Sequence, residues 1–68
     1  MKEIKEWNSG KLVMKLEGDV IRDWNSGNLL YRVDGEEVRE WNSGQLIFRL
    51  EGEEMRDWNS WKLLYRVE

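Results

Sequence analysis

Apolar and polar residues alternate along short segments that recur through the chain. Residues 46–50, with the sequence LIFRL, alternate Leu, Phe and Leu against Ile and Arg. This two-residue period is typical of a β-strand with one buried face. The preceding segment, 36–41, also suits a short helix, because Val38 and Trp41 lie three residues apart. A helix of about six to eight residues is too short to be stable alone, so we predict a second strand there.

These segments belong to a repeat of 17 residues, which is marked by evenly spaced tryptophans at Trp7, Trp24, Trp41 and Trp58. Each of these tryptophans begins the motif WNSG, except in the last unit, where the motif is WNSW. No linker separates the units, so we predict one repeat domain, residues 1–68, with four units: 1–17, 18–34, 35–51 and 52–68. Units one and three resemble each other, as do units two and four, so the half-repeats are 1–34 and 35–68.

The turn residues predict a β-hairpin in each unit. The motif WNSG suits a type I turn in which Gly10, Gly27 or Gly44 takes a left-handed conformation, and Asp34-Gly35 suits a two-residue type I′ turn between units. The first turn predicts that Glu37 pairs with Arg49, and that Val38 pairs with Phe48. The turn at Asp34-Gly35 predicts three pairs between the segments on either side of it: Arg32 with Glu37, Tyr31 with Val38, and Leu30 with Arg39.

In this register one row across the sheet is apolar in every strand: Ile4, Met14, Ile21, Tyr31, Val38, Phe48, Met55 and Tyr65. The leucines at 12, 29, 46 and 63 flank this row on the same face. We predict an all-β fold, an antiparallel up-and-down meander of about eight short strands. The register steps straight across without stagger, so the prediction is an open twisted sheet that pairs face to face in an oligomer. The alternatives are a small closed β-barrel, a β-solenoid, and a short helix plus strand in each repeat.

Composition narrows the classes of function. The chain has 68 residues, a formal charge of −3, and no Cys, His or Pro. It therefore has no thiolate nucleophile, no imidazole base and no ordinary zinc site, and we predict that it is not an enzyme and needs no cofactor. No signal peptide or transmembrane segment is visible, which indicates a cytoplasmic or unknown location and no membrane partner.

The phrase WNSGQL, followed by an alternating strand and EG or DG, resembles the hairpin units of MORN-like repeat proteins. The resemblance covers all four units in rhythm, although the period of 17 residues and the missing Tyr-x-Gly-x-Trp core depart from that family. It implies a scaffold or interaction module and assigns no functional residue. A designed or engineered repeat protein is the alternative, since the chain contains no Ala or Thr.

One candidate binding surface combines aromatic and cationic side chains. The four repeat tryptophans are expected on the same face as the basic residues of the adjoining strand, and such pairs stack on bases or sugars. The competing interpretation is that each Trp packs on an Arg stem within the protein. Interleaved acids make nucleic acid an unlikely ligand. The platform would contain Trp7, Trp24, Trp41, Trp58, Arg22, Arg39 and Arg56.

The primary prediction is a non-catalytic structural repeat protein that associates with itself as a homodimer or higher oligomer. Its self-association surface would be the apolar sheet face, with Ile4, Tyr31, Val38, Phe48, Met55, Tyr65 and Trp61. Trp61 stands where the other units have Gly, so either the last turn changes type or the side chain gains a contact that offsets strain. The alternative function is a binding module for a carbohydrate, a peptide or nucleic acid.

Overall fold

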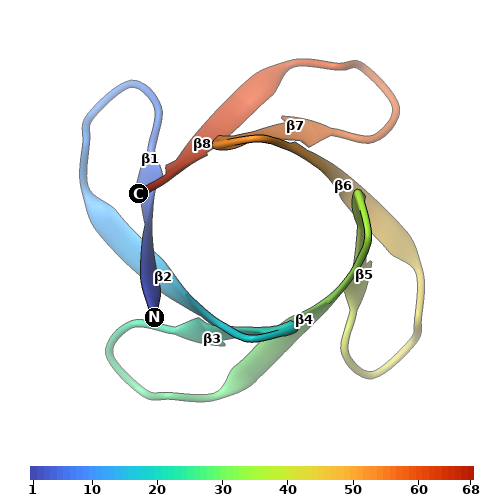
Figure 1. Cartoon of the computed structure of the whole chain (residues 1–68), viewed down its shortest axis with the longest axis horizontal. Coiled ribbons are helices and arrows are strands. Elements are labelled where there is room, and N and C mark those ends of the chain that lie inside the picture. The colour runs from blue at the N-terminus through green and yellow to red at the C-terminus, as the bar shows by residue number, and fades with distance from the viewer.

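The computed structural model covers residues 1–68 and contains eight antiparallel strands that close into a barrel. Viewed along its shortest axis, the molecule is a ring from which four hairpin ends project outward (Figure 1). It measures 24 × 24 × 16 Å. The strands follow one another around the ring in chain order: β1 (Lys2–Glu6), β2 (Leu12–Glu17), β3 (Val20–Asp23), β4 (Leu29–Asp34), β5 (Glu37–Glu40), β6 (Leu46–Glu51), β7 (Glu54–Asp57) and β8 (Leu63–Val67).

The meander of eight antiparallel strands confirms the all-β prediction, but the open sheet is wrong. β8 pairs with β1, with Val67 opposite Ile4 and Arg66 opposite Lys5. The sheet therefore has no free edge, and its apolar face is turned inward instead of toward a second molecule. Segments 36–41 and their equivalents form strands and turns, so the alternative with a short helix in each repeat is also wrong.

Closure follows from a stagger that the predicted register lacks. Between units, Val33 pairs with Val38 and Arg32 with Arg39, so the predicted pairs of Arg32 with Glu37 and Tyr31 with Val38 are displaced by two residues. The same displacement recurs where β2 meets β3 and where β6 meets β7. A displacement of two residues keeps every side chain on its face. It also adds the shear that a sheet needs in order to close.

The turn between units explains the displacement. The two loop residues are Gly35 and Glu36, flanked by the pair Asp34 and Glu37, instead of the predicted Asp34-Gly35. Gly35 has a φ of 65° while Glu36 is not among the residues with positive φ. Glycine with positive φ in the first loop position alone is typical of a type II′ turn, whereas a type I′ turn needs positive φ at both positions.

Within each unit the predicted pairing is confirmed and interrupted by a bulge. Glu37 pairs with Arg49 and Val38 with Phe48, after which Arg39 pairs with Leu46. Ile47 is thus the extra residue of the bulge, and it packs against the core. The equivalent bulge residues Val13, Leu30 and Leu64 do the same. The leucines predicted on the apolar face, at 12, 29, 46 and 63, instead lie opposite the basic residues Lys5, Arg22, Arg39 and Arg56.

The core fills the barrel. Seven side chains are buried: Ile4, Met14, Ile21, Val38, Phe48, Met55 and Val67. Six of the eight residues in the predicted apolar row are among them, and the other two, Tyr31 and Tyr65, are half-buried. Both tyrosine rings contact Phe48 edge-on, at 5.3 and 5.7 Å between centroids. Most of the residues proposed for self-association therefore lie inside the barrel, and the predicted homo-oligomer loses the exposed apolar face on which it was based.

Candidate functional site

The contact between β8 and β1 closes the ring, and we call this pairing the seam. Glu3 and Glu68 exchange two backbone hydrogen bonds: the Glu3 N–H donates to the Glu68 carbonyl at 2.8 Å, and the Glu68 N–H donates to the Glu3 carbonyl at 2.7 Å. At the other end of the seam the Trp7 N–H donates to the Leu64 carbonyl at 3.0 Å. The seam is thus hydrogen-bonded along its whole length.

The seam reproduces the three junctions that join consecutive units, β2–β3, β4–β5 and β6–β7. Ile4 faces Val67 as Val38 faces Val33, and Glu6 faces Tyr65 as Glu40 faces Tyr31. The bond from the Trp7 N–H also has counterparts, because the N–H groups of Trp24, Trp41 and Trp58 donate to the carbonyls of Val13, Leu30 and Ile47 at 3.2, 3.1 and 3.1 Å. The two chain ends therefore meet in the geometry of an internal junction.

Each repeat tryptophan lies under a cation from the neighbouring hairpin. The guanidinium carbons of Arg32, Arg49 and Arg66 lie 4.7, 4.3 and 4.5 Å from the ring centroids of Trp41, Trp58 and Trp7. The Lys15 ammonium lies farther from its ring, 5.9 Å from the centroid of Trp24. Such pairs are attractive because the face of the indole ring carries a partial negative charge. The four pairs form a band around the outside of the barrel, and one of them crosses the seam.

The basic residues expected beside the tryptophans have other partners. The guanidinium groups of Arg22, Arg39 and Arg56 donate to the carbonyls of Gly27, Gly44 and Trp61 at 2.9, 3.0 and 3.1 Å. They also form ion pairs with acids, as Arg39 does with Glu37 at 2.9 Å. Each clamps the end of its own hairpin. The structure therefore separates them from the stacking role, which belongs to Lys15, Arg32, Arg49 and Arg66.

The two sets of cations face each other across the junctions. Arg32 pairs directly with Arg39, and Arg49 with Arg56. Like charges in directly opposite positions destabilise a strand pair. The structure separates them by giving each cation a different partner, because Arg32 stacks on a tryptophan while Arg39 binds a carboxylate and a carbonyl.

Trp61 keeps the left-handed turn that Gly forms elsewhere. Its φ is 66°, close to the 74° of Gly44 at the equivalent position. The side chain is 49% exposed and covers Arg49, whose guanidinium carbon lies 4.0 Å from the Trp61 ring centroid and 4.3 Å from that of Trp58. Arg49 thus lies between two indoles, and its Nε is buried without a hydrogen-bond partner. Of the two outcomes expected for Trp61, the structure shows the added contact and no change of turn type.

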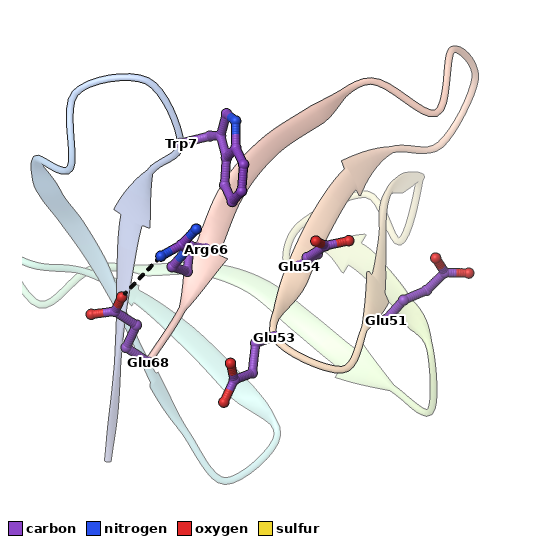
Figure 2. A pocket seen from close by; sticks show the side chains of 6 residues that line it. All are labelled: Trp7, Glu51, Glu53, Glu54, Arg66 and Glu68. Atoms are coloured by element: carbon purple, nitrogen blue, oxygen red, sulfur yellow. Dashed lines mark ion pairs between the residues drawn. The ribbon is translucent and has the colours of Figure 1, made fainter.

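Two hollows lie beside the seam, and both border Trp7, Arg66 and Glu68. The larger, about 450 Å³, is completed by Glu51, Glu53 and Glu54. The smaller, about 300 Å³, is completed by Lys5, Glu6 and Gly10. Figure 2 shows Trp7 and Arg66 on one side of the larger hollow and the glutamates of β6, β7 and their turn on the other. Arg66 forms an ion pair with Glu68 at 3.8 Å.

The acids at the hairpin ends stabilise the turns. The Asp23 carboxylate accepts hydrogen bonds from the Ser26 N–H at 2.9 Å and the Ser26 hydroxyl at 3.1 Å, and Asp57 does the same with Ser60. These bonds, with the N–H of Ser26 contributing most, lower the pKa of Asp23, and those of Ser60 likewise lower the pKa of Asp57. Inside the barrel, burial raises the pKa of Tyr31, with smaller contributions from Tyr65 and Glu40.

The hollow at the seam was missed in the sequence because it joins residues from both ends of the chain. Its one visible signal is the spacing of nine residues from each stacking cation to the next Trp, from Lys15 to Trp24 and from Arg32 to Trp41. Continuing that spacing from Arg66 past the C-terminus and back to the start of the 68-residue chain leads to Trp7.

The fold and this surface define an eight-stranded antiparallel barrel with an aromatic and acidic hollow at its seam. Comparison of the chain with protein-family models, with curated proteins and with solved structures found no match. No helix in the structure is long and apolar enough to cross a membrane. No group of three or more acidic side chains is arranged to hold a metal ion.

Proposed function

We propose that the protein is a non-catalytic binding module and that its ligand surface is the larger hollow beside the seam. The observation that supports this proposal is the position of Trp7. Its side chain is 40% exposed, one of the few large apolar groups at the surface, and it borders both hollows of the molecule. An indole with an accessible face beside polar groups is a common anchor for ligands.

The charge of the hollow favours a basic peptide among the three ligand classes considered from the sequence. Four glutamates line it, against the single lining cation Arg66. Glu68 pairs with Arg66, and Glu51 and Glu54 pair with Arg56 beside the hollow, so Glu53 is the carboxylate without an ion-pair partner. The whole chain has a formal charge of −3. A Lys or Arg side chain of a peptide would gain attraction both from the carboxylates and from the Trp7 ring. Nucleic acid would meet repulsion from the same groups.

A titration with a short oligolysine peptide, followed by tryptophan fluorescence, tests this proposal. We expect saturable binding that weakens as salt is added, and no response to a neutral oligosaccharide or a single-stranded oligonucleotide. In the double variant Glu53→Gln/Glu54→Gln the affinity should fall by a factor of about five, since each exposed ion pair contributes a fraction of a kcal/mol.

The chain provides a matched control for this test. Glu36 and Glu37 occupy the equivalent positions one unit earlier, and Glu37 pairs with Arg39 as Glu54 pairs with Arg56, each at 2.9 Å. Neither residue borders a hollow. The variant Glu36→Gln/Glu37→Gln should bind oligolysine like the parent. Equal losses in both variants would indicate attraction to net charge alone and would contradict the proposal.

A structural, self-associating repeat protein is the second candidate function. The observation that favours it is the equivalence of the seam and the internal junctions, because a surface that pairs two parts of one chain without a covalent turn also fits the same part of another copy. The solution mass, measured by light scattering over a range of concentrations, tests it. A mass of 8.3 kDa at every concentration would contradict self-association.

A further inference from the structure

The seam has the strand pairing, the backbone hydrogen bond and the stacked cation of an internal junction such as β4–β5, but no turn connects its two strands. It has the same pairing as β4–β5, the same backbone bond from a Trp N–H, and the same stacking of an Arg on that Trp. β1 is the first strand and β8 the last, so no turn connects these two strands. The contacts of a junction therefore hold two strands together without a turn.

The junction in the middle of the chain, β4–β5, has the contacts of the seam and also a turn. β4 and β5 make the same contacts as β8 and β1, and in addition they are joined through Gly35 and Glu36. Each half of the chain thus has the same two edges: β1 and β5 at the start, and β4 and β8 at the end. The last strand of either half fits the first strand of the other.

We propose that two copies of this chain exchange halves, so that β1–β4 of one copy forms a barrel with β5–β8 of the other. The partner is a second copy because only this chain has edges that match in register, in backbone bonds and in the stacked Arg–Trp pair. Both junctions of each mixed barrel are ones that the structure already shows, the seam and β4–β5. No new contact is required except that residues 34–37 extend from one barrel to the next.

The turn at Gly35 determines which form dominates. While it is tight, the two halves of one chain meet at a high effective concentration, and the closed monomer is favoured in dilute solution. Gly35 has a φ of 65°, a conformation that a β-branched residue adopts only with strain. A substitution that opens this turn leaves the junction contacts intact and removes the preference for the partner in the same chain. Hinge-loop substitutions of this kind promote domain swapping.

The first experiment compares Gly35→Val with Gly44→Val by light scattering. We expect Gly35→Val to have a mass twice that of one chain, which is 8.3 kDa, and a β-type far-ultraviolet spectrum. Gly44 has a φ of 74° and lies inside a hairpin, where the strand pair contains a bulge and has no counterpart that lacks a turn. Gly44→Val should therefore remain a monomer of lower stability. A folded, monomeric Gly35→Val would overturn the proposal.

A circular permutant decides the outcome if Gly35→Val does not fold. The permutant starts at Gly35, runs to Glu68 and continues from residue 1 to Asp34, with Met1→Gly. The new bond gives the seam a two-residue turn, because residue 1 and Lys2 take the places of Gly35 and Glu36. A folded permutant with a β-type spectrum shows that β4 and β5 pair without a turn and supports the proposal. An unfolded permutant overturns it.

Discussion

The guanidinium of Arg66, in the last strand, lies over the ring of Trp7, which directly follows the first strand, with 4.5 Å between the guanidinium carbon and the ring centroid. Arg32 lies over Trp41 in the same way, at 4.7 Å. Arg32 and Trp41 are close in sequence, whereas Trp7 and Arg66 come from opposite ends of the chain. The contact at the seam is thus equivalent to a contact between consecutive hairpins.

This equivalence predicts equal losses from two substitutions. Arg66→Met and Arg32→Met each keep an apolar stem and remove the cation from the indole face. We expect each to lower the free energy of unfolding by about 0.5–1 kcal/mol, the usual strength of an exposed cation–π pair. Urea denaturation of the two variants and the parent measures these losses. A loss in Arg32→Met with none in Arg66→Met would indicate that the seam is open in solution.

The core predicts a clear ranking of charged substitutions. Val38 is fully buried on β5, so Val38→Asp should unfold the protein, because an unpaired buried charge costs several kcal/mol. Ile47 is half-buried at the bulge and packs on the edge of the core, so Ile47→Asp should be milder. Circular dichroism at room temperature, with a thermal scan, distinguishes the two. If Ile47→Asp were more destabilising than Val38→Asp, the assignment of the inner and outer faces of the barrel would be wrong.

Trp61 predicts a measurable coupling with Arg49. Trp61→Gly relieves a left-handed backbone, worth about 1–2 kcal/mol, but it also exposes the Arg49 guanidinium and removes a half-buried indole. Burial of roughly 100 Å² of apolar surface contributes about 2.5 kcal/mol, so we expect a net destabilisation of about 1 kcal/mol. A double-mutant cycle of Trp61→Gly with Arg49→Met should give a coupling of about 1 kcal/mol. Independent effects of the two substitutions would show that the stacking contributes nothing.

The hairpin aspartates predict a loss of stability in acid. The folded pKa of Asp23 lies below its ordinary value of 3.8 because the carboxylate accepts bonds from Ser26, and Asp57 has the same arrangement with Ser60. A lowered folded pKa gives stability that is present above the unfolded value and is lost as the pH falls through the folded value. Urea midpoints measured from about pH 5 to about pH 2 should therefore decrease.

The variant Asp23→Asn/Asp57→Asn tests that assignment. Its urea midpoint should decrease less than that of the parent over the same acid range, because neither amide titrates. Asp34→Asn is the control, since the Asp34 side chain accepts no hydrogen bond from the protein and lies in a strand end. If the double variant and the parent lost stability in parallel, the two aspartates would have no part in the acid transition.

The strands and the inward face could be predicted from the sequence because they depend on local alternation. The positions of Ile4, Ile21 and Val38 on one face follow from a two-residue period, and a displacement of two residues does not change that face. The pairing of Val38 with Phe48 follows from the turn that connects their strands. These features need only the residues of one hairpin.

Closure of the barrel could not be predicted because it depends on a two-residue displacement between neighbouring strands at each junction between units. A type I′ turn at Asp34-Gly35 places Arg32 opposite Glu37, and the sheet predicted from that register has no stagger. The structure instead places Arg32 opposite Arg39 and relieves the repulsion by stacking Arg32 on Trp41. The preference of Gly35 for the first loop position of a type II′ turn was the available signal. The hollow at Trp7 depends on closure, so it was missed for the same reason.

Hydrogen exchange of the Trp7 backbone amide, followed by nuclear magnetic resonance, is the most direct test of the closed ring. The Trp7 N–H donates to the Leu64 carbonyl at 3.0 Å across the seam, as the Trp41 N–H donates to the Leu30 carbonyl at 3.1 Å across an internal junction. Amides bonded inside a cooperative sheet exchange slowly, whereas those on a free edge exchange quickly. A closed barrel predicts similar protection for Trp7 and Trp41. Strong protection of Trp41 with none at Trp7 would contradict closure.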